Sequence, residues 1–190
     1  KPMIDATKLA ISDINSHGGV LGQKLNLKLY DGQSTNDKYT QFATQLALRD
    51  KAVVIMGGIT SASREAMRPV IDRTKTLYFY NEQYEGGVCD KYVFNTGVVP
   101  SQQLLALVPW AIKNVGKRFY VLAADYNYGH ISADWVKKYA ARFGGEVVGT
   151  DFIPLDVSDF GSEISKLQDA KPQVVLSLLV GGNHIAFYRA

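Results

Sequence analysis

Residues 53–66, VVIMGGITSASREA, carry the sequence signals of a strand, a tight turn and the start of a helix in direct succession. The apolar run that opens the stretch is typical of a buried strand, and two glycines then turn the backbone. Thr60, Ser61 or Ser63 can cap the helix that follows. Free N–H groups and the positive end of the helix dipole favour a carboxylate, an amide oxygen or a phosphate there. The same pattern also fits an ordinary strand-to-helix connection with a plain serine cap.

The rest of the chain repeats this alternation. Apolar residues spaced three and four apart predict helices, and alternating or β-branched runs predict strands. The strands expected on this basis are residues 25–30, 53–56, 77–80, 92–95, 119–123, 147–153 and 174–180. Strands that alternate with helices to the end of the chain predict an α/β fold with parallel sheets flanked by helices.

A hinge is expected near Thr96, Gly97 and Pro100, where a short strand gives way to a new helix. We therefore predict two lobes, residues 1–98 and residues 99–190. Each lobe contains a glycine-rich helix end before a strand, which fits two units of like build, although such helix ends are equally common in any α/β protein.

Composition excludes several classes of function. The chain has 190 residues, a net charge of +3 and no Lys/Arg run, which argues against nucleic acid as a partner. No apolar run reaches the roughly 18 residues that a membrane span requires. Cys89 is the single cysteine, so no disulfide can form within the chain, and we interpret it as a bystander.

Polar and aromatic residues gather in the loops that follow the predicted strands, where doubly wound sheets bind ligands. These residues are Tyr80, Glu82, Tyr84, Glu85, Asp125, Tyr126 and Tyr128. They suit a small polar molecule held by hydrogen bonds and aromatic walls, although the tyrosines could equally border the core.

No motif of a reaction centre accompanies them. The nucleotide-binding glycine loops, the G-x-S-x-G elbow and H-E-x-x-H are absent, and His17, His130 and His184 stand apart in the sequence. We predict no catalytic residue, no metal site and no cofactor.

Several motifs together resemble the type I periplasmic binding proteins, in the branch that serves urea, short-chain amides and branched-chain amino acids. The resemblance spans the whole chain. Its motifs are A-x-x-L-A-x-x-x-I-N-x-x-G-G-V-x-G at residues 6–22, G-I-T-S at 58–61 with Pro69 following, Q-Y-E-G at 83–86, D-Y-N-Y at 125–128 and F-I-P-L at 152–155.

The resemblance implies two Rossmann-like lobes that close on a small ligand and deliver it to the membrane permease of an ABC transporter. It implies that Ser61 bonds the ligand, that Tyr80 lines the first lobe, and that Tyr126 and Tyr128 close from the second. It also implies a periplasmic location, or an extracellular one with a membrane anchor. The family has a strand before the first helix and continues through both lobes, so we expect this chain to be a fragment.

Glu82 departs from the resemblance, because similar amide receptors carry a small hydroxyl residue there. A carboxylate favours ligands with several N–H donors or a positive charge. Glu82 could instead face solvent or pair with Arg64. We therefore expect a non-enzymatic binding component for urea, a short-chain amide or an amino acid. The alternatives are an amide or amino-acid sensor module of the same fold and, from another class, an α/β enzyme.

Overall fold

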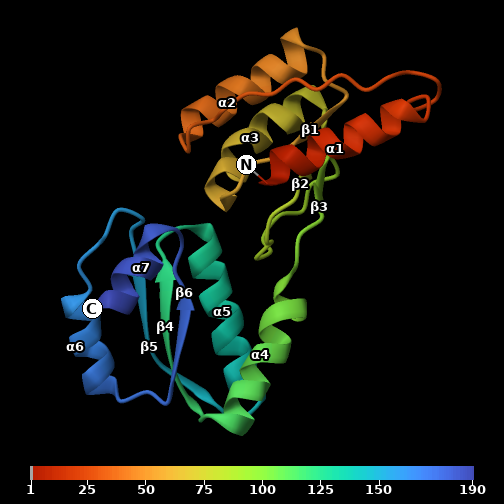
Figure 1. Ribbon diagram of the computed structural model, residues 1–190. Helices are drawn as coiled ribbons and strands as arrows, with labels where there is room; N and C mark the ends of the chain where they lie inside the picture. The colour runs from red at the N-terminus through yellow and green to blue at the C-terminus, as the bar shows by residue number, and fades with distance from the viewer. Residues whose placement is uncertain (1) are drawn as a thin grey trace.

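A computed structural model describes residues 2–190 as two parallel three-stranded sheets with helices around them (Figure 1). The helices are α1 (Pro2–Ser16), α2 (Asn36–Thr44), α3 (Ser61–Thr74), α4 (Pro100–Asn114), α5 (Asn127–Arg142), α6 (Gly161–Ala170) and α7 (Gly182–Arg189), with a π-helical turn η1 (Gln45–Arg49) after α2. The strands are β1 (Val54–Met56), β2 (Leu77–Tyr80), β3 (Val93–Asn95), β4 (Arg118–Ala124), β5 (Glu146–Ile153) and β6 (Val174–Leu178). The α/β class and the parallel sheets predicted from the sequence are confirmed.

The first sheet has the order β1-β2-β3, and it is covered on one face. Ile55, Tyr78 and Val93 point to that face and pack with apolar residues of α2 and α3. Residues on the opposite face alternate with them, as the two-residue period of a strand requires, and include Phe79, which stacks on Phe94 with 5.0 Å between ring centroids.

The second sheet has the order β5-β4-β6, so that β4 lies in the centre. Successive β4 residues enter different clusters. Phe119 and Val121 pack with α4 and α5, whereas Tyr120 and Leu122 pack with Ile153 and with residues of α6 and α7. This sheet is therefore covered on both faces, which is the usual condition of a parallel sheet.

One crossing of the chain, residues 96–99, joins the two sheets between β3 and α4 (Figure 1). The backbone N–H of Tyr84 donates to the carbonyl of Val98 at 2.9 Å and holds this crossing against the segment after β2. The crossing lies where the sequence places the lobe boundary. We keep residues 1–98 and 99–190 as the proposed lobes, and call them lobe one and lobe two.

The expected strand at residues 25–30 is wrong. These residues join no strand of the structure. Asn15 of α1 instead bonds both the N–H and the carbonyl of Leu25, at 2.7 and 2.9 Å, so a side chain satisfies backbone groups that a neighbouring strand would pair. Alternation of leucines marks a possible strand, but a strand also needs a partner.

No helix within residues 2–190 has both the length and the hydropathy needed to cross a bilayer.

Candidate ligand-binding site

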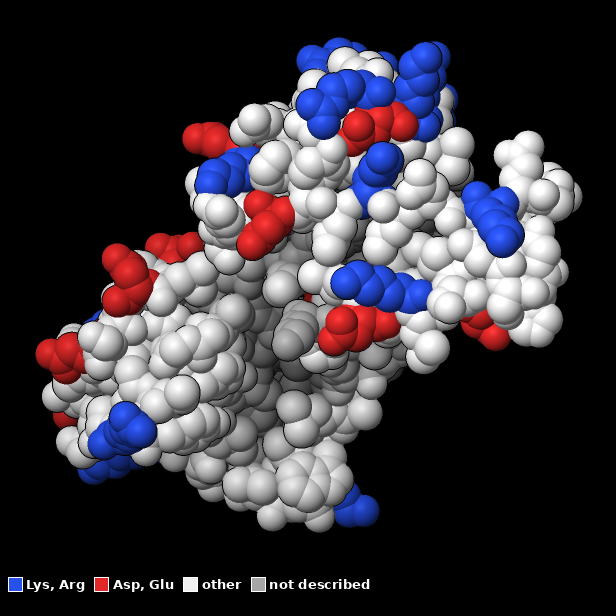
Figure 2. Space-filling view, turned by 45° about the horizontal axis from the view of Figure 1, so that its top comes forward, with Lys and Arg blue, Asp and Glu red and all other residues white. Residues whose placement is uncertain are grey.

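A cavity of about 330 Å³ lies between the two lobes, at the carboxyl ends of their strands. The space-filling view shows the molecule hollowed between its two parts, with charged side chains scattered around (Figure 2). Loops and helix starts from both lobes line the cavity, at Ile59, Thr60, Tyr80, Glu82, Gln83, Tyr126, Tyr128, Leu179, Val180, Gly181 and His184. The volume is at the small end of the range for ligand pockets, which suits a small solute.

The wall from lobe one is fixed by tyrosines of β2. The Tyr78 hydroxyl donates to the carbonyl of Gly57 at 2.9 Å, and the Tyr80 hydroxyl donates to the carbonyl of Ile59 at 2.8 Å. Gly58 has φ +76°, and a Cβ there would lie 3.0 Å from the Tyr78 hydroxyl, so the turn requires glycine. The predicted strand, turn and helix start is therefore a rigid edge of the cavity.

Helix α3 starts at this edge, and Thr60 is its N-cap. The Thr60 Oγ1 accepts a hydrogen bond from the backbone N–H of Ser63 at 3.1 Å. This bond settles which of the three candidate hydroxyls caps the helix. Ser61, the first residue of α3, is 1% exposed, and its Oγ has no hydrogen-bond partner among residues 2–190.

The wall from lobe two is the start of α5. A Cβ on Gly129 would lie 1.9 Å from the carbonyl oxygen of Ala124, so glycine lets the first turn of α5 approach the end of β4. This approach sets Tyr126 and Tyr128 at the cavity with 6.0 Å between ring centroids. The Nε2 of Gln83 donates to the Tyr128 hydroxyl at 3.2 Å, and this bond joins the two lobes across the cavity.

Burial is the main influence on the titration of these tyrosines. It raises the pKa of Tyr126 to about 12, with smaller contributions from Tyr128 and from the charge of Glu85. Burial also raises the pKa of Tyr128, against a lowering by the bond from Gln83. Both hydroxyls are therefore neutral at physiological pH and can donate hydrogen bonds to a ligand.

Three helices begin at the cavity. The residues that precede α3, α5 and α7, namely Thr60, Tyr126 and Gly181, all line it. The first N–H groups of a helix have no acceptor within the helix, and the helix dipole adds partial positive charge there. Glu82 contributes the one carboxylate that lines the cavity within residues 2–190. The site thus offers both donors for an acceptor group and an acceptor for a donor group.

The structure brings together most of the residues that the sequence singled out. Tyr80, Glu82, Tyr126 and Tyr128 all line the cavity, whereas Ser61, which follows the lining residue Thr60 in the sequence, is buried and is not part of the lining. The binding of a ligand by these residues stays a prediction.

The suggested pairing of Glu82 with Arg64 is wrong. The guanidinium of Arg64 pairs with Glu85 at 2.6 Å and with Glu65 at 3.1 Å. Burial acts to lower the pKa of Arg64, but the hydrogen bond and charge of Glu85 outweigh it and raise that pKa.

Two polar residues of the cavity, Gln83 and His184, were not predicted as site residues from the sequence. Gln83 belongs to the Q-Y-E-G motif, and His184 stands apart from the other histidines in the sequence, so neither carries a local signal of ligand binding. His184 lies in the first turn of α7, a helix that the sequence analysis did not anticipate, and its Nδ1 is 3.5 Å from the Ser177 hydroxyl. The residues at 181–183, which directly follow a predicted strand, were the signal that could have identified His184. A helix that begins there places its first residues at the same edge of the sheet as the cavity.

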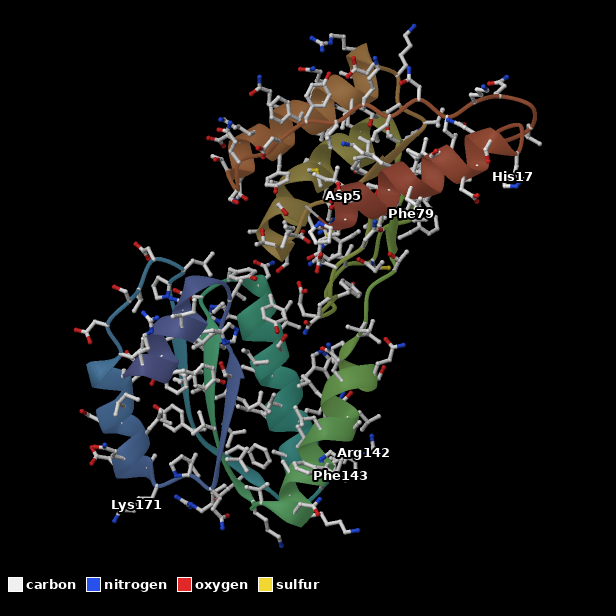
Figure 3. The ribbon with its side chains drawn as sticks, viewed as in Figure 1. Asp5, His17, Phe79, Arg142, Phe143 and Lys171 are labelled. Atoms are coloured by element: carbon white, nitrogen blue, oxygen red, sulfur yellow. The ribbon has the colours of Figure 1, made fainter. Side chains whose placement is uncertain are left out.

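His17 and His130 lie outside the cavity lining. His130 is not isolated, because its Nε2 lies 2.8 Å from a carboxylate oxygen of Asp125, but both side chains are about half exposed. His17 lies at the far end of α1 (Figure 3). Within residues 2–190, no three His, Cys, Asp or Glu side chains are placed to hold a metal ion together.

Known proteins share this architecture. A periplasmic binding protein from Burkholderia mallei aligns with a TM-score of 0.87 and 24% identity, over 98% of this chain and 50% of its own. An ABC transporter solute binding protein from Rhodopseudomonas palustris, in complex with 3,4-dihydroxybenzoic acid, aligns with a TM-score of 0.77 and 24% identity, over 97% and 54%. A leucine binding protein from Thermotoga maritima aligns with a TM-score of 0.77 and 21% identity, over 88% and 49%.

At these identities the likeness shows a common fold, and the chain spans about half the length of each of these structures. The sequence profile of one family, described as the periplasmic binding protein domain, matches residues 1–190. The chain therefore belongs to the periplasmic binding protein domain family.

Proposed function

We propose that the chain is the solute-capturing part of an ABC uptake transporter. It holds a small nitrogen-rich solute, namely urea, a short-chain amide or an amino acid, between its two lobes. It then presents the solute to a membrane permease, from the periplasm or from the outer face of a membrane to which it is anchored, and catalyses no reaction. The family match and the transporter proteins of the same fold support this general role.

The observation that carries the proposal is the pairing of three helix starts with one carboxylate at the same cavity. The helix starts behind Thr60, Tyr126 and Gly181 favour a carboxylate or carbonyl oxygen. Glu82 favours N–H donors or a positive charge. Within the proposed class an amino acid meets both demands, because it carries a carboxylate and an ammonium group on one carbon.

Aromatic acids are the strongest competitors. The Rhodopseudomonas palustris protein was solved with a dihydroxybenzoic acid, and tyrosine rings also form walls of the present cavity. A hydroxybenzoate would satisfy the helix starts and can donate its phenol O–H to Glu82, but it has no positive charge to balance that carboxylate, and its own negative charge would be repelled by Glu82. We therefore rank a neutral zwitterion above an anion.

The test is a calorimetric titration of the purified protein, freed of bound solute by unfolding and refolding, with leucine, urea, acetamide and 4-hydroxybenzoate. The variant Glu82→Thr restores the small hydroxyl residue of the amide receptors. Hydrogen bonds to charged groups contribute about 1.5–3 kcal/mol, so leucine should bind roughly 10- to 150-fold more weakly, while acetamide should bind as well or better.

Glu163→Thr on α6, outside the cavity lining, is the matched control and should leave the order of the four solutes unchanged. An identical order in the parent protein and in Glu82→Thr would remove Glu82 from the site. Binding of 4-hydroxybenzoate alone would overturn the nitrogen-rich class.

A further inference from the structure

Glu85 is buried between the lobes and makes one bond to each of them. Its side chain is 0% exposed, and its Oε1 accepts a hydrogen bond from Arg64 Nη2 at 2.6 Å. Its backbone carbonyl accepts a hydrogen bond from the indole Nε1 of Trp135 at 2.9 Å. Arg64 belongs to α3 and Trp135 to α5, the two helices whose starts face each other across the cavity.

On the lobe-one side, Arg64 connects Glu85 to the cavity wall through direct side-chain contacts. Its guanidinium lies over the ring of Tyr80, 4.8 Å from the centroid, and over the ring of Tyr84 at 5.1 Å. Tyr80 lines the cavity. Glu85, Arg64 and Tyr80 therefore form a continuous contact from the space between the lobes to the solute site.

On the lobe-two side, Trp135 lies seven residues after Tyr128, so both side chains project from the same face of α5 two turns apart. Both contact one short segment after β2, since Gln83 donates to the Tyr128 hydroxyl and Trp135 donates to the carbonyl of Glu85. Figure 1 shows this segment reaching from the upper lobe toward α5. Trp135 is itself held by stacking on Tyr139, with 5.5 Å between centroids.

The packing around this contact is incomplete. A second cavity of about 300 Å³ borders Glu85, Gly86 and Trp135. Glu85 Oε2 and Arg64 Nη1 are buried and have no hydrogen-bond partner among residues 2–190. Two hydrogen bonds, the bond from Trp135 to the Glu85 carbonyl and the bond from Gln83 to Tyr128, join the lobes within residues 2–190, so each can carry much of the resistance of the lobes to separation.

We propose that Glu85 and Trp135 are positioning residues that couple the relative placement of the two lobes to the solute site. Their hydrogen bond holds the tyrosines of α5 opposite the α3 edge before any solute arrives. Without it, the lobes spend more time apart and fewer molecules have both cavity walls at binding distance. A solute then binds with an apparent affinity reduced by the fraction of molecules that are competent.

Trp135→Phe tests the bond, because it removes the indole N–H and keeps an aromatic ring. One spin label is placed on Cys89, which is exposed and lies between β2 and β3, and a second on Gln168→Cys, exposed on α6 of lobe two. Pulsed electron resonance then gives the distance distribution in the absence of solute. We expect the ratio of separated to closed molecules to rise about 2- to 10-fold, the range of a single hydrogen bond.

Trp110→Phe is the matched control, since Trp110 is 58% exposed on α4 and should leave the distribution unchanged. Thermal unfolding of each variant separates a change of lobe placement from loss of the fold. If Trp135→Phe does not fold, Glu85→Gln tests the Arg64 contact and should shift the distribution in the same direction. Equal distributions in the Trp135 or Glu85 variant and in the control would overturn the proposal.

Affinity gives a second readout, which rests on the proposed function, whereas the distance readout does not. Leucine should bind Trp135→Phe more weakly by the factor by which the fraction of closed molecules falls in the distance distribution, and Trp110→Phe as the parent does. An unchanged leucine affinity beside a shifted distribution would overturn the coupling to the site. If leucine does not bind the parent protein, the choice of solute fails, and the distance distributions still decide on Glu85 and Trp135.

Discussion

The two sheets have the same number of strands in parallel arrangement but differ in how they are covered. In the second sheet, every β4 residue from 119 to 124 is buried, and hydrophobic clusters cover both faces. In the first sheet the strands have three or four residues, and one hydrophobic cluster covers one face. The exposed residues of the other face include Met56 at 52%, Leu77 at 41% and Phe94 at 43%.

The two lobes that border the cavity are therefore stabilised in different ways. Lobe two holds its tyrosines on a helix packed against a sheet with a complete core. Lobe one depends on hydrogen bonds from tyrosines and on the buried Arg64 and Glu85 pair to fix its edge of the cavity. Apolar packing supports one wall, and specific polar contacts support the other.

The largest expected effect is on stability in the second sheet. Leu122 in β4 is 0% exposed, so Leu122→Ala should lower the free energy of unfolding by about 2–5 kcal/mol. Leu77→Ala makes the same chemical change at a 41% exposed position of the first sheet and should cost less than about 1 kcal/mol. Urea unfolding of both variants measures the contrast, and equal losses would show that the first sheet is covered as fully as the second.

The next effect is on solute affinity at the edge of lobe one. Ser61→Ala removes a buried hydroxyl that has no partner among residues 2–190, so the empty protein should lose no stability. If the hydroxyl bonds the solute, affinity should fall by about 1–3 kcal/mol, roughly five- to over a hundredfold.

Ser132→Ala on α5 is the matched control for Ser61→Ala, because Ser132 is also buried, at 2%, and, unlike Ser61, has no residue of the solute-cavity lining next to it in the sequence. Titration with leucine compares the two variants. The same affinity in both would leave Ser61 as a residue of the helix start with no part in binding.

The smallest effect on stability is expected at the uncovered face of the first sheet. Substitutions there should instead change the association of the chain with other copies of itself. β1 and β3 are edge strands, and the apolar residues beside them can pair or pack with another copy. The 190-residue chain should therefore associate as its concentration rises, and Phe94→Lys should reduce this. Light scattering measures it, with Trp110→Lys on α4 as the control; an equal response of the two variants would place the contact elsewhere.

Much of the fold could be predicted because its signals are local. The run at residues 53–56, the glycines after it and the helix spacing that follows all appear in the structure as expected. The leucines at 25, 27 and 29 alternate as in a strand, yet these residues form none. A strand also requires hydrogen bonds to a neighbouring strand, and the local sequence does not show whether such a neighbour is present. The short helix α7 was missed because its eight residues hold too few turns to show a clear apolar period.

The types of residue at the site could be predicted, but the side chains with which each of them interacts could not. Position after a strand brought Tyr80, Glu82, Tyr126 and Tyr128 to one cavity, as the carboxyl-end rule requires. The same rule cannot distinguish Glu82, which lines the cavity, from Glu85, which is buried against Arg64. The two residues lie in one loop, and long-range contacts alone separate their roles.

The tyrosine bonds to the turn of lobe one have a consequence for how solutes are distinguished. The hydroxyls of Tyr78 and Tyr80 already donate to backbone carbonyls, so Tyr80 borders the cavity without a free hydroxyl proton to donate to a solute. These hydroxyls lose their bound water when the protein folds, so the binding of a solute does not require them to be desolvated again. These two tyrosines therefore contribute shape rather than hydrogen bonds to a solute, and discrimination between solutes falls chiefly on the start of α3, on Glu82 and on the groups that lobe two presents.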